Sequence, residues 1–237
     1  MITKIATIML GITAGCYAVP ITVPNFSFET ATLTLNAGNG PFSQLIPGSS
    51  LASASGTLAS WTASSTTSSA EAGAFAPTAG GNNWTNTWWQ GNNVGYLLLE
   101  GAGTAALNGA LGVNLNNNET YALAVDIGRR ILAGNFNYTV ELLAGTTVLA
   151  SASNLALAHN SSGTDSLTYS SGSSNPLAGS PLSIQFVVTD SGTTLTEAYF
   201  DNVRLDGSAT TIPEPGALTL VTLGGLFSAI MARKRLT

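Results

Sequence analysis

The sequence predicts an all-β protein, an antiparallel two-sheet sandwich of the jelly-roll kind, because apolar and polar residues alternate along much of it. In the run TYALAVDIG, Tyr121, Leu123, Val125 and Ile127 fall on one face of a strand and the residues between them fall on the other. Turn-forming clusters such as NGNGP, NLNNNE and SSGSSNP separate runs of this kind. Between the two ends of the chain, no stretch has the 3.6-residue period of a convincing helix.

The first segment, residues 1–18, has the layout of a cleavable secretory signal. Lys4 precedes an apolar stretch, and small residues follow as far as Ala18, after which we expect cleavage. A competing interpretation makes Cys16 a lipid-bearing N-terminus, because residues 13–16 approach a lipoprotein box. Cys16 is the only cysteine, so the sequence predicts no disulfide, no thiolate zinc site and no cysteine nucleophile.

The body, residues 19–207, is long enough for one domain with its own core. Its early part, from about residue 52 to 81, is rich in Ser, Ala, Thr and Gly, and Trp61 is expected to anchor at least one strand there. Residues 144–147 read as a hairpin turn between two strands. The runs SPLSIQFVVTD and LTEAYFDNVRLD supply two further strands.

The C-terminal segments differ from the body. Residues 208–215 form a short stalk that ends in Pro213, Glu214 and Pro215. Residues 216–232 carry no charge, and as a helix they would be just long enough to cross a bilayer, so we expect a transmembrane helix. The basic tail, residues 233–237, is then expected to stay in the cytoplasm, with the body outside.

The charges of the body exclude one class of partner. Of the seven basic residues only Arg129, Arg130 and Arg204 lie in the body, against eleven acidic residues from Glu29 to Asp206. A protein that binds nucleic acid needs a basic surface, so we expect no nucleic-acid partner. Arg129 and Arg130 follow a predicted strand, and we expect them to form a salt bridge to Asp126; contact with an anionic ligand is the alternative.

Three tryptophans lie among asparagines in the run GNNWTNTWWQGNN. Trp84, Trp88 and Trp89 could offer aromatic faces for sugar rings to stack on, beside amide groups that hydrogen-bond to hydroxyls. They could equally plug the open end of a sandwich, because tryptophan is buried on average. The sequence leaves both interpretations open.

Asp201 is the most informative acidic residue. Strand alternation places it on the same face as Tyr199 and Val203, opposite Phe200. A carboxylate on an apolar face needs a cation, hydrogen-bond donors or a proton.

The ending of the chain resembles the PEP-CTERM sorting signal of bacterial envelope proteins, in which Pro213, Glu214 and Pro215 precede an apolar helix and a basic tail. This resemblance implies that a membrane-embedded exosortase cuts near the motif and that the body reaches the cell surface or extracellular matrix of a Gram-negative-type bacterium. A permanent membrane anchor is the alternative.

The runs NFSFE and YFDNVRL resemble the first and last strands of jelly-roll domains of the carbohydrate-binding-module kind. That resemblance implies one structural calcium ion, bound by Glu29 and Asp201.

A third resemblance covers most of residues 21–207. The runs GNNVGYLLLE, TYALAVDIG, YTVELLAGTTVLA and YFDNVRL, in that order, are similar to the Stig cyclase domain of hapalindole-type alkaloid biosynthesis. In that family an aspartate near the C-terminal strand acts as the acid that starts a rearrangement, with a tyrosine nearby. The resemblance implies Asp201 and Tyr96 for these roles.

From the sequence we expect an exported, exosortase-processed surface or matrix protein whose β-sandwich is not catalytic and binds a polysaccharide through its tryptophans. A Stig-type cyclase that uses an aspartate acid is the first alternative. A structural or ice-contacting surface protein is the second.

Overall fold

The structure is a computed structural model, and it describes residues 17–31, 33–36, 40–46, 57–77, 87–130, 134–192 and 195–210. Within these ranges the chain forms strands and turns, and none of it is a helix long and apolar enough to cross a membrane. Residues 1–16 of the expected leader, Trp84, the motif Pro213 to Pro215 and the apolar segment 216–232 lie outside the described residues.

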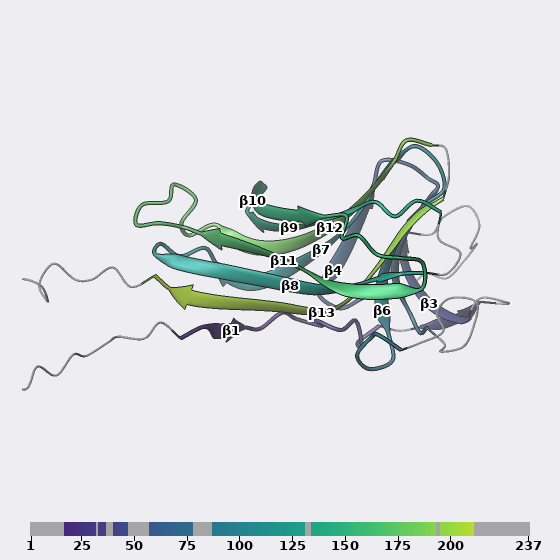
Figure 1. The fold of residues 1–237 in the computed structure, drawn as a ribbon, viewed down its shortest axis with the longest axis horizontal. Helices are drawn as coiled ribbons and strands as arrows, with labels where there is room; N and C mark the ends of the chain where they lie inside the picture. The colour runs from purple at the N-terminus through teal and green to yellow at the C-terminus, as the bar shows by residue number, and fades with distance from the viewer. Residues whose placement is uncertain are drawn as a thin grey trace, which may run out of the picture.

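Two antiparallel sheets pack face to face, which confirms the predicted sandwich (Figure 1). The larger sheet has the order β11-β8-β13-β6-β5-β3-β2, with β1 also paired to β13, and the smaller has the order β10-β9-β12-β7-β4. The larger sheet comprises β1 (Val19–Ile21), β2 (Thr34–Asn36), β3 (Gly40–Ile46), β5 (Ala70–Phe75), β6 (Val94–Leu99), β8 (Glu119–Arg129), β11 (Ser161–Ser170) and β13 (Thr196–Ala209). The smaller comprises β4 (Trp61–Ser65), β7 (Gly103–Asn114), β9 (Tyr138–Ala144), β10 (Thr147–Ser153) and β12 (Pro181–Asp190).

The strands expected from period-two alternation form where the pattern places them. In β8 the four alternating residues Tyr121 to Ile127 are all buried in the core. The hairpin between β9 and β10 turns at Gly145, whose φ of +60° suits a glycine. Trp61 is 3% exposed at the start of β4 and so is the anchor that the sequence predicts.

A file of six aromatic side chains runs through the core between the sheets. Phe200 of the larger sheet stacks on Phe186 of the smaller one, with ring centroids 4.4 Å apart and planes 5° from parallel. The file continues in both directions with centroid spacings of 5.1 to 6.1 Å, through Phe136, Tyr138, Phe200, Phe186, Trp61 and Phe28. It therefore links the start of β9 with the N-terminal segment that precedes β2.

Strand β13 departs from the alternation that the sequence predicts. Phe200 and Val203 both face the core, although residues three apart in a regular strand lie on opposite faces. The pairing of β13 with β8 shifts register between Asp201 and Arg204, and Asn202 has a φ of +49°. This β-bulge inserts one residue, so Asp201 does share the outer face with Tyr199, but Val203 does not.

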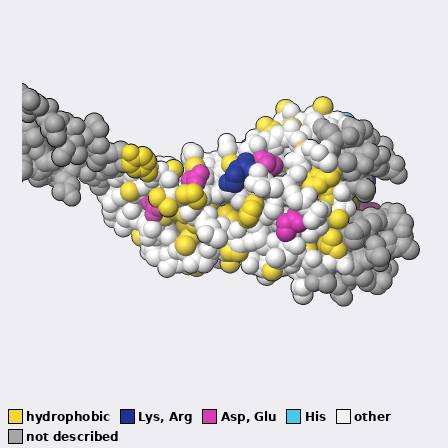
Figure 2. Space-filling view, turned by 90° about the horizontal axis from the view of Figure 1, so that it is seen from below, with side chains coloured by type: hydrophobic (Ala, Val, Ile, Leu, Met, Phe, Trp, Pro, Cys, Tyr) yellow, Lys and Arg dark blue, Asp and Glu magenta, His cyan; other side chains and the backbone are white. Residues whose placement is uncertain are grey.

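Charged groups are sparse on the molecular surface. Figure 2 shows a face on which a few acidic side chains and one basic group lie among scattered hydrophobic side chains, backbone and uncharged polar groups. This agrees with the 8% of charged residues in the sequence.

Candidate functional site

A cleft of about 590 Å³ opens between the two sheets at one end of the sandwich. Its wall includes Asn135, Phe136 and Asn137, which lead into β9. Thr189 and Asp190 at the end of β12 and Thr196 at the start of β13 also line it. Its volume lies in the range of small-molecule sites, and it combines an aromatic ring with a few polar groups.

Two polar side chains of the cleft occupy core-facing positions. In β12, Asp190 follows Val188 in the inward register, and in β13, Thr196 precedes the inward Ala198. The Oδ2 atom of Asp190 and the Oγ1 atom of Thr196 are buried and have no hydrogen-bond partner among the described residues. Buried polar atoms without partners are rare in native structures, so these two atoms single out the cleft as the candidate site.

The remaining contacts of Asp190 fix its carboxylate. Its Oδ1 atom accepts a hydrogen bond of 2.9 Å from the backbone N–H of Gly192, where the chain turns out of β12. One oxygen therefore holds the turn, and the other, Oδ2, is buried beside the cleft without a hydrogen-bond partner among the described residues.

The ring of Phe136 is held in the wall of the cleft by its neighbours. It meets Tyr138 edge-on at a centroid distance of 5.1 Å, and the Arg129 guanidinium lies 5.5 Å from its centroid. Arg129 in turn donates a hydrogen bond of 2.8 Å to the carbonyl of Leu157. These contacts fix the orientation of an aromatic surface that is half-buried in the cleft.

The segment that carries Asn135 is fastened to β13. The N–H of Asn135 donates to the carbonyl of Leu195 at 2.9 Å, and the N–H of Glu197 donates to the carbonyl of Asn135 at 3.3 Å. The Asn135 side of the cleft is thus tied to the strand that carries Thr196.

Behind the cleft, on the outer face of the larger sheet, lies a buried ionic cluster of Glu197, Tyr199 and Arg130. The Tyr199 hydroxyl donates to Glu197 Oε2 at 2.8 Å, and Arg130 Nε lies 3.2 Å from Glu197 Oε1. Burial raises the pKa of Glu197, although Arg130 and Tyr199 oppose that rise. No sequence motif predicts a role for Glu197, because its partner Arg130 comes from a distant part of the sequence.

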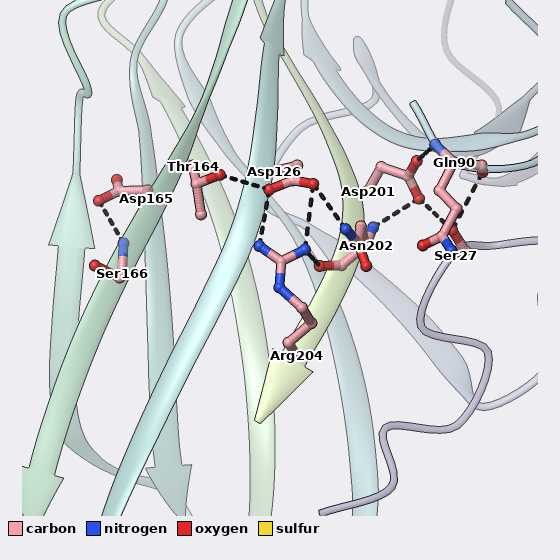
Figure 3. Close-up of polar contacts among 9 residues, drawn as sticks. All are labelled: Ser27, Gln90, Asp126, Thr164, Asp165, Ser166, Asp201, Asn202 and Arg204. Atoms are coloured by element: carbon pink, nitrogen blue, oxygen red, sulfur yellow. Dashed lines mark hydrogen bonds and ion pairs between the residues drawn. The ribbon is translucent and has the colours of Figure 1, made fainter. Parts of the chain in front are cut away.

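Asp201 holds a loop on the same outer face (Figure 3). Its Oδ1 accepts hydrogen bonds from the Ser27 hydroxyl and the Asn202 N–H, both at 2.7 Å, and its Oδ2 accepts one from the Gln90 N–H. Asp201 is fully buried, and burial raises its pKa to about 6 in spite of these three donors.

The neighbouring Asp126 forms a second polar group in Figure 3. It accepts two hydrogen bonds from Arg204, at 2.9 and 3.2 Å, and one each from Thr164 and Asn202. Burial would raise the pKa of Asp126, but these donors outweigh it and lower the pKa below its ordinary value. The expected bridge from Arg129 or Arg130 to Asp126 is therefore wrong: Arg204 lies beside Asp126 after the bulge, and Arg130 pairs with Glu197.

Glu29 holds the same loop as Asp201. Its Oε1 accepts from the N–H groups of Asn92 and Asn93 at 2.8 and 2.9 Å. A side chain at Gly91, whose φ is +77°, would overlap the Glu29 carboxylate, so this glycine lets the loop close over it.

Glu29 and Asp201 meet part of what the predicted calcium site requires. Two carboxylates converge on one loop, and calcium prefers such oxygen ligands, but it takes six to eight of them. The described residues contain no group of three or more acidic, histidine or cysteine side chains that could hold a metal. Amide and backbone oxygens would have to complete the set, and calcium stays a prediction.

The other predicted residues lie on the outer face, away from the cleft. Tyr96 is 2% exposed and packs with Phe75 and Tyr199. Trp88 and Trp89 are half-buried, meet edge-on at 6.2 Å and pack against this cluster. A side chain at Gly128 would overlap the ring of Trp88, so this glycine lets Trp88 pack directly against β8.

The comparisons with known proteins fit this architecture. The sequence profile of the HpiC1-like family, described as HpiC1 cyclase, matches residues 19–206. The chain therefore belongs to the HpiC1-like cyclase family. A search of curated proteins gave no match.

Solved structures agree with the family. The Stig cyclase Fisc from Fischerella sp. TAU, in complex with (3Z)-3-(1-methyl-2-pyrrolidinylidene)-3H-indole, is similar with 26% identity and a TM-score of 0.65 over 82% of this chain and 100% of that one. A cyclase from Fischerella sp. TAU in complex with 4-(1H-indol-3-yl)butan-2-one gives 25% identity and a TM-score of 0.64, with the same coverage. An arabinose-bound α-L-arabinofuranosidase, MgGH51, shares the fold alone, at 17% identity and a TM-score of 0.52 over 81% of this chain and 27% of that one.

These findings correct the functional expectation. The prediction of a non-catalytic, glycan-binding domain is wrong, because the family and the ligand complexes indicate a cyclase, which is an enzyme. The first alternative from the sequence fits instead. Trp88 and Trp89, which the sequence offers for sugar stacking, pack against the apolar cluster on the outer face of the larger sheet.

The raised pKa of Asp201 predicts a pH dependence of folding stability. Its pKa in the unfolded chain is about 3.9, so the proton is held more tightly in the folded state. The stability that Asp201 contributes is fully present below about pH 4 and is lost as the pH rises through about 6. Relative to wild type, Asp201→Asn should gain free energy of unfolding between pH 4 and 7, by up to about 3 kcal/mol. Urea denaturation with chelator in every sample measures this, and a difference that stays constant over that range would contradict it.

Chelation tests the calcium prediction. An ion that binds only the folded state stabilises it by about 2.7 kcal/mol at one hundred times its dissociation constant. The thermal midpoint of the wild type should therefore fall on chelation and recover with calcium, and Glu29→Gln should abolish the response. A midpoint that ignores chelator and calcium alike would show that Glu29 and Asp201 only hold the loop.

Proposed function

We propose that this protein is a cyclase that binds a 3-substituted indole in the cleft between the sheets and promotes ring closure by proton transfer from Asp190. Both similar cyclases were solved with indole compounds bound, which supports an indole as the ligand class. The observation that carries the assignment to this site is the inward carboxylate of Asp190, whose Oδ2 atom is without a partner in a cleft of suitable volume.

The cleft supplies what an acid-promoted cyclisation needs. Asp190, as the general acid, transfers a proton to an alkene carbon of the substrate, and the resulting cation is captured by a nearby carbon of the substrate as the ring closes. The ring-closed cation then loses a proton to the Asp190 carboxylate, which restores the acid and leaves a product that is an isomer of the substrate. Phe136 offers a fixed aromatic surface on which an indole can stack.

Asp201 and Tyr96 are less accessible than Asp190. Asp201 is fully buried and its oxygens accept three hydrogen bonds, and Tyr96 is 2% exposed. Asp190 is only half-buried and lines the cleft. Since a general acid has to reach the atom that it protonates, the geometry favours Asp190.

The test is a cyclisation assay with the full-length chain and an isonitrile indole that carries an alkene side chain. A product of unchanged mass and altered chromatographic retention should form. General acids typically contribute 10²–10⁴-fold, so Asp190→Asn should lower kcat by about 100-fold or more. Asp206→Asn removes a carboxyl group on β13 that does not line the cleft. It is the matched control and should leave the rate unchanged.

Asp201→Asn separates the two possible acids. If this variant stays folded by circular dichroism and loses turnover while Asp190→Asn keeps it, Asp201 is the acid. If the wild type gives no isomer with any indole of this class, the proposed activity is refuted.

We also propose that the cyclase domain is exported and that the C-terminal segment is a PEP-CTERM sorting signal cut by an exosortase. The support is in the sequence alone: a leader-like start, then Pro213, Glu214 and Pro215 before an apolar run and a basic tail. The domain would then act at the cell surface or in the extracellular matrix.

Mass spectrometry of protein from the native envelope tests this processing. The mature form should lack the residues beyond about Gly216, because the apolar segment would be left behind in the membrane. Peptides that contain Leu236 and Thr237 in the mature surface form would contradict it.

A further inference from the structure

We infer that the Thr196 hydroxyl accepts a hydrogen bond from the ring N–H of the indole, so that Thr196 selects ligands with a free indole nitrogen. This inference rests on the proposed indole site and adds the group that sets the orientation of the ring within it.

Among the described residues, none forms a hydrogen bond with the Thr196 hydroxyl. The residue is 1% exposed, and Leu99, its pairing partner in β6, is fully buried and apolar. The next inward residue of β13, Ala198, is also fully buried. Its Oγ1 atom is buried and has no hydrogen-bond partner in the described part of the chain, and the residue lines the cleft. A polar atom left in this state loses its hydration without compensation, so a ligand that pairs with it gains affinity.

The chemistry of the indole ring matches this position. An indole N–H donates a hydrogen bond and cannot accept one, whereas a threonine hydroxyl has two lone pairs. Asp190 is the other polar group at an inward position of the cleft, but its Oδ1 already accepts from Gly192 and its carboxyl is assigned to proton transfer. Thr196 lies on the larger sheet and Asp190 on the smaller one. A ring seated with its N–H on Thr196 therefore has the opposite sheet, with Asp190, available for its 3-substituent.

Thr196 is thus a specificity-determining residue rather than a proton donor. A site built to hydrogen-bond a donor discriminates against the analogue that lacks it, because its own polar group is then left unpaired. The Thr196 hydroxyl should discriminate between an N–H indole and its N-methyl counterpart.

The experiment compares two ligands and three proteins. The dissociation constants of 4-(1H-indol-3-yl)butan-2-one and of its N-methyl analogue are measured by calorimetry for wild type, Thr196→Val and Thr196→Ser, each as the full-length chain. Wild type should bind the N–H compound about tenfold more tightly. Thr196→Val, which keeps the shape and removes the hydroxyl, should reduce that preference to within about twofold, mainly by weakening the N–H compound. Thr196→Ser keeps the hydroxyl and should retain the preference.

Thermal denaturation of the same proteins separates this role from a structural one. Since the hydroxyl has no partner in the protein, Thr196→Val should leave the midpoint unchanged or raise it. A lower midpoint for Thr196→Val together with an unchanged ligand preference would overturn the inference and make the hydroxyl structural.

The remaining outcomes are also decisive. If wild type binds the N–H compound and Thr196→Val leaves the preference intact while Asp190→Asn removes it, the acceptor is Asp190 and the inference fails, although the indole site stands. If wild type binds neither compound and forms no isomer in the cyclisation assay, the proposed function is wrong, and the inference about Thr196 fails with it.

Discussion

The bulge in strand β13 is the constraint on which the rest of the site depends. A regular strand could not point both Phe200 and Val203 into the core. Asn202 resolves the conflict by taking a left-handed conformation, which asparagine tolerates better than most residues. On one side of the bulge Phe200 completes the aromatic file, and on the other Arg204 reaches Asp126.

The same strand separates two polar systems that lie close in sequence. Thr196 faces the cleft between the sheets, and Glu197, one residue later, faces the outer side and pairs with Arg130. Asp201 also faces outward and holds the loop of Gln90. The outer carboxyl groups therefore direct their hydrogen bonds and ion pair to the sheet and its loop, and the inner face of the strand lines the cleft.

The aromatic file connects that inner face to the remainder of the core. Tyr138 contacts both Phe136 in the wall of the cleft and Phe200 in the centre of the sandwich. Its hydroxyl donates to Asp165 at 2.8 Å and accepts from the N–H of Leu155 at 3.0 Å. The wall of the cleft is thus fixed by contacts to both sheets, which is the rigidity that a site for a small planar ligand requires.

The sequence by itself determined the two-sheet fold, because alternation in runs such as Tyr121 to Ile127 can bury one face only in a sandwich of strands. It also contained a signal for Asp190: the alternation from Leu182 to Val188 continues inward to a carboxylate. Only the tertiary structure decided which acidic side chains are fully buried, as Asp201 is, and which line the cleft, as Asp190 does. The bulge at Asn202 and the pairing of Arg130 with Glu197 arise from contacts between distant strands, and no local pattern encodes them. The cleft forms where the ends of β12 and β13 and the start of β9 meet, so its residues belong together only in the folded chain.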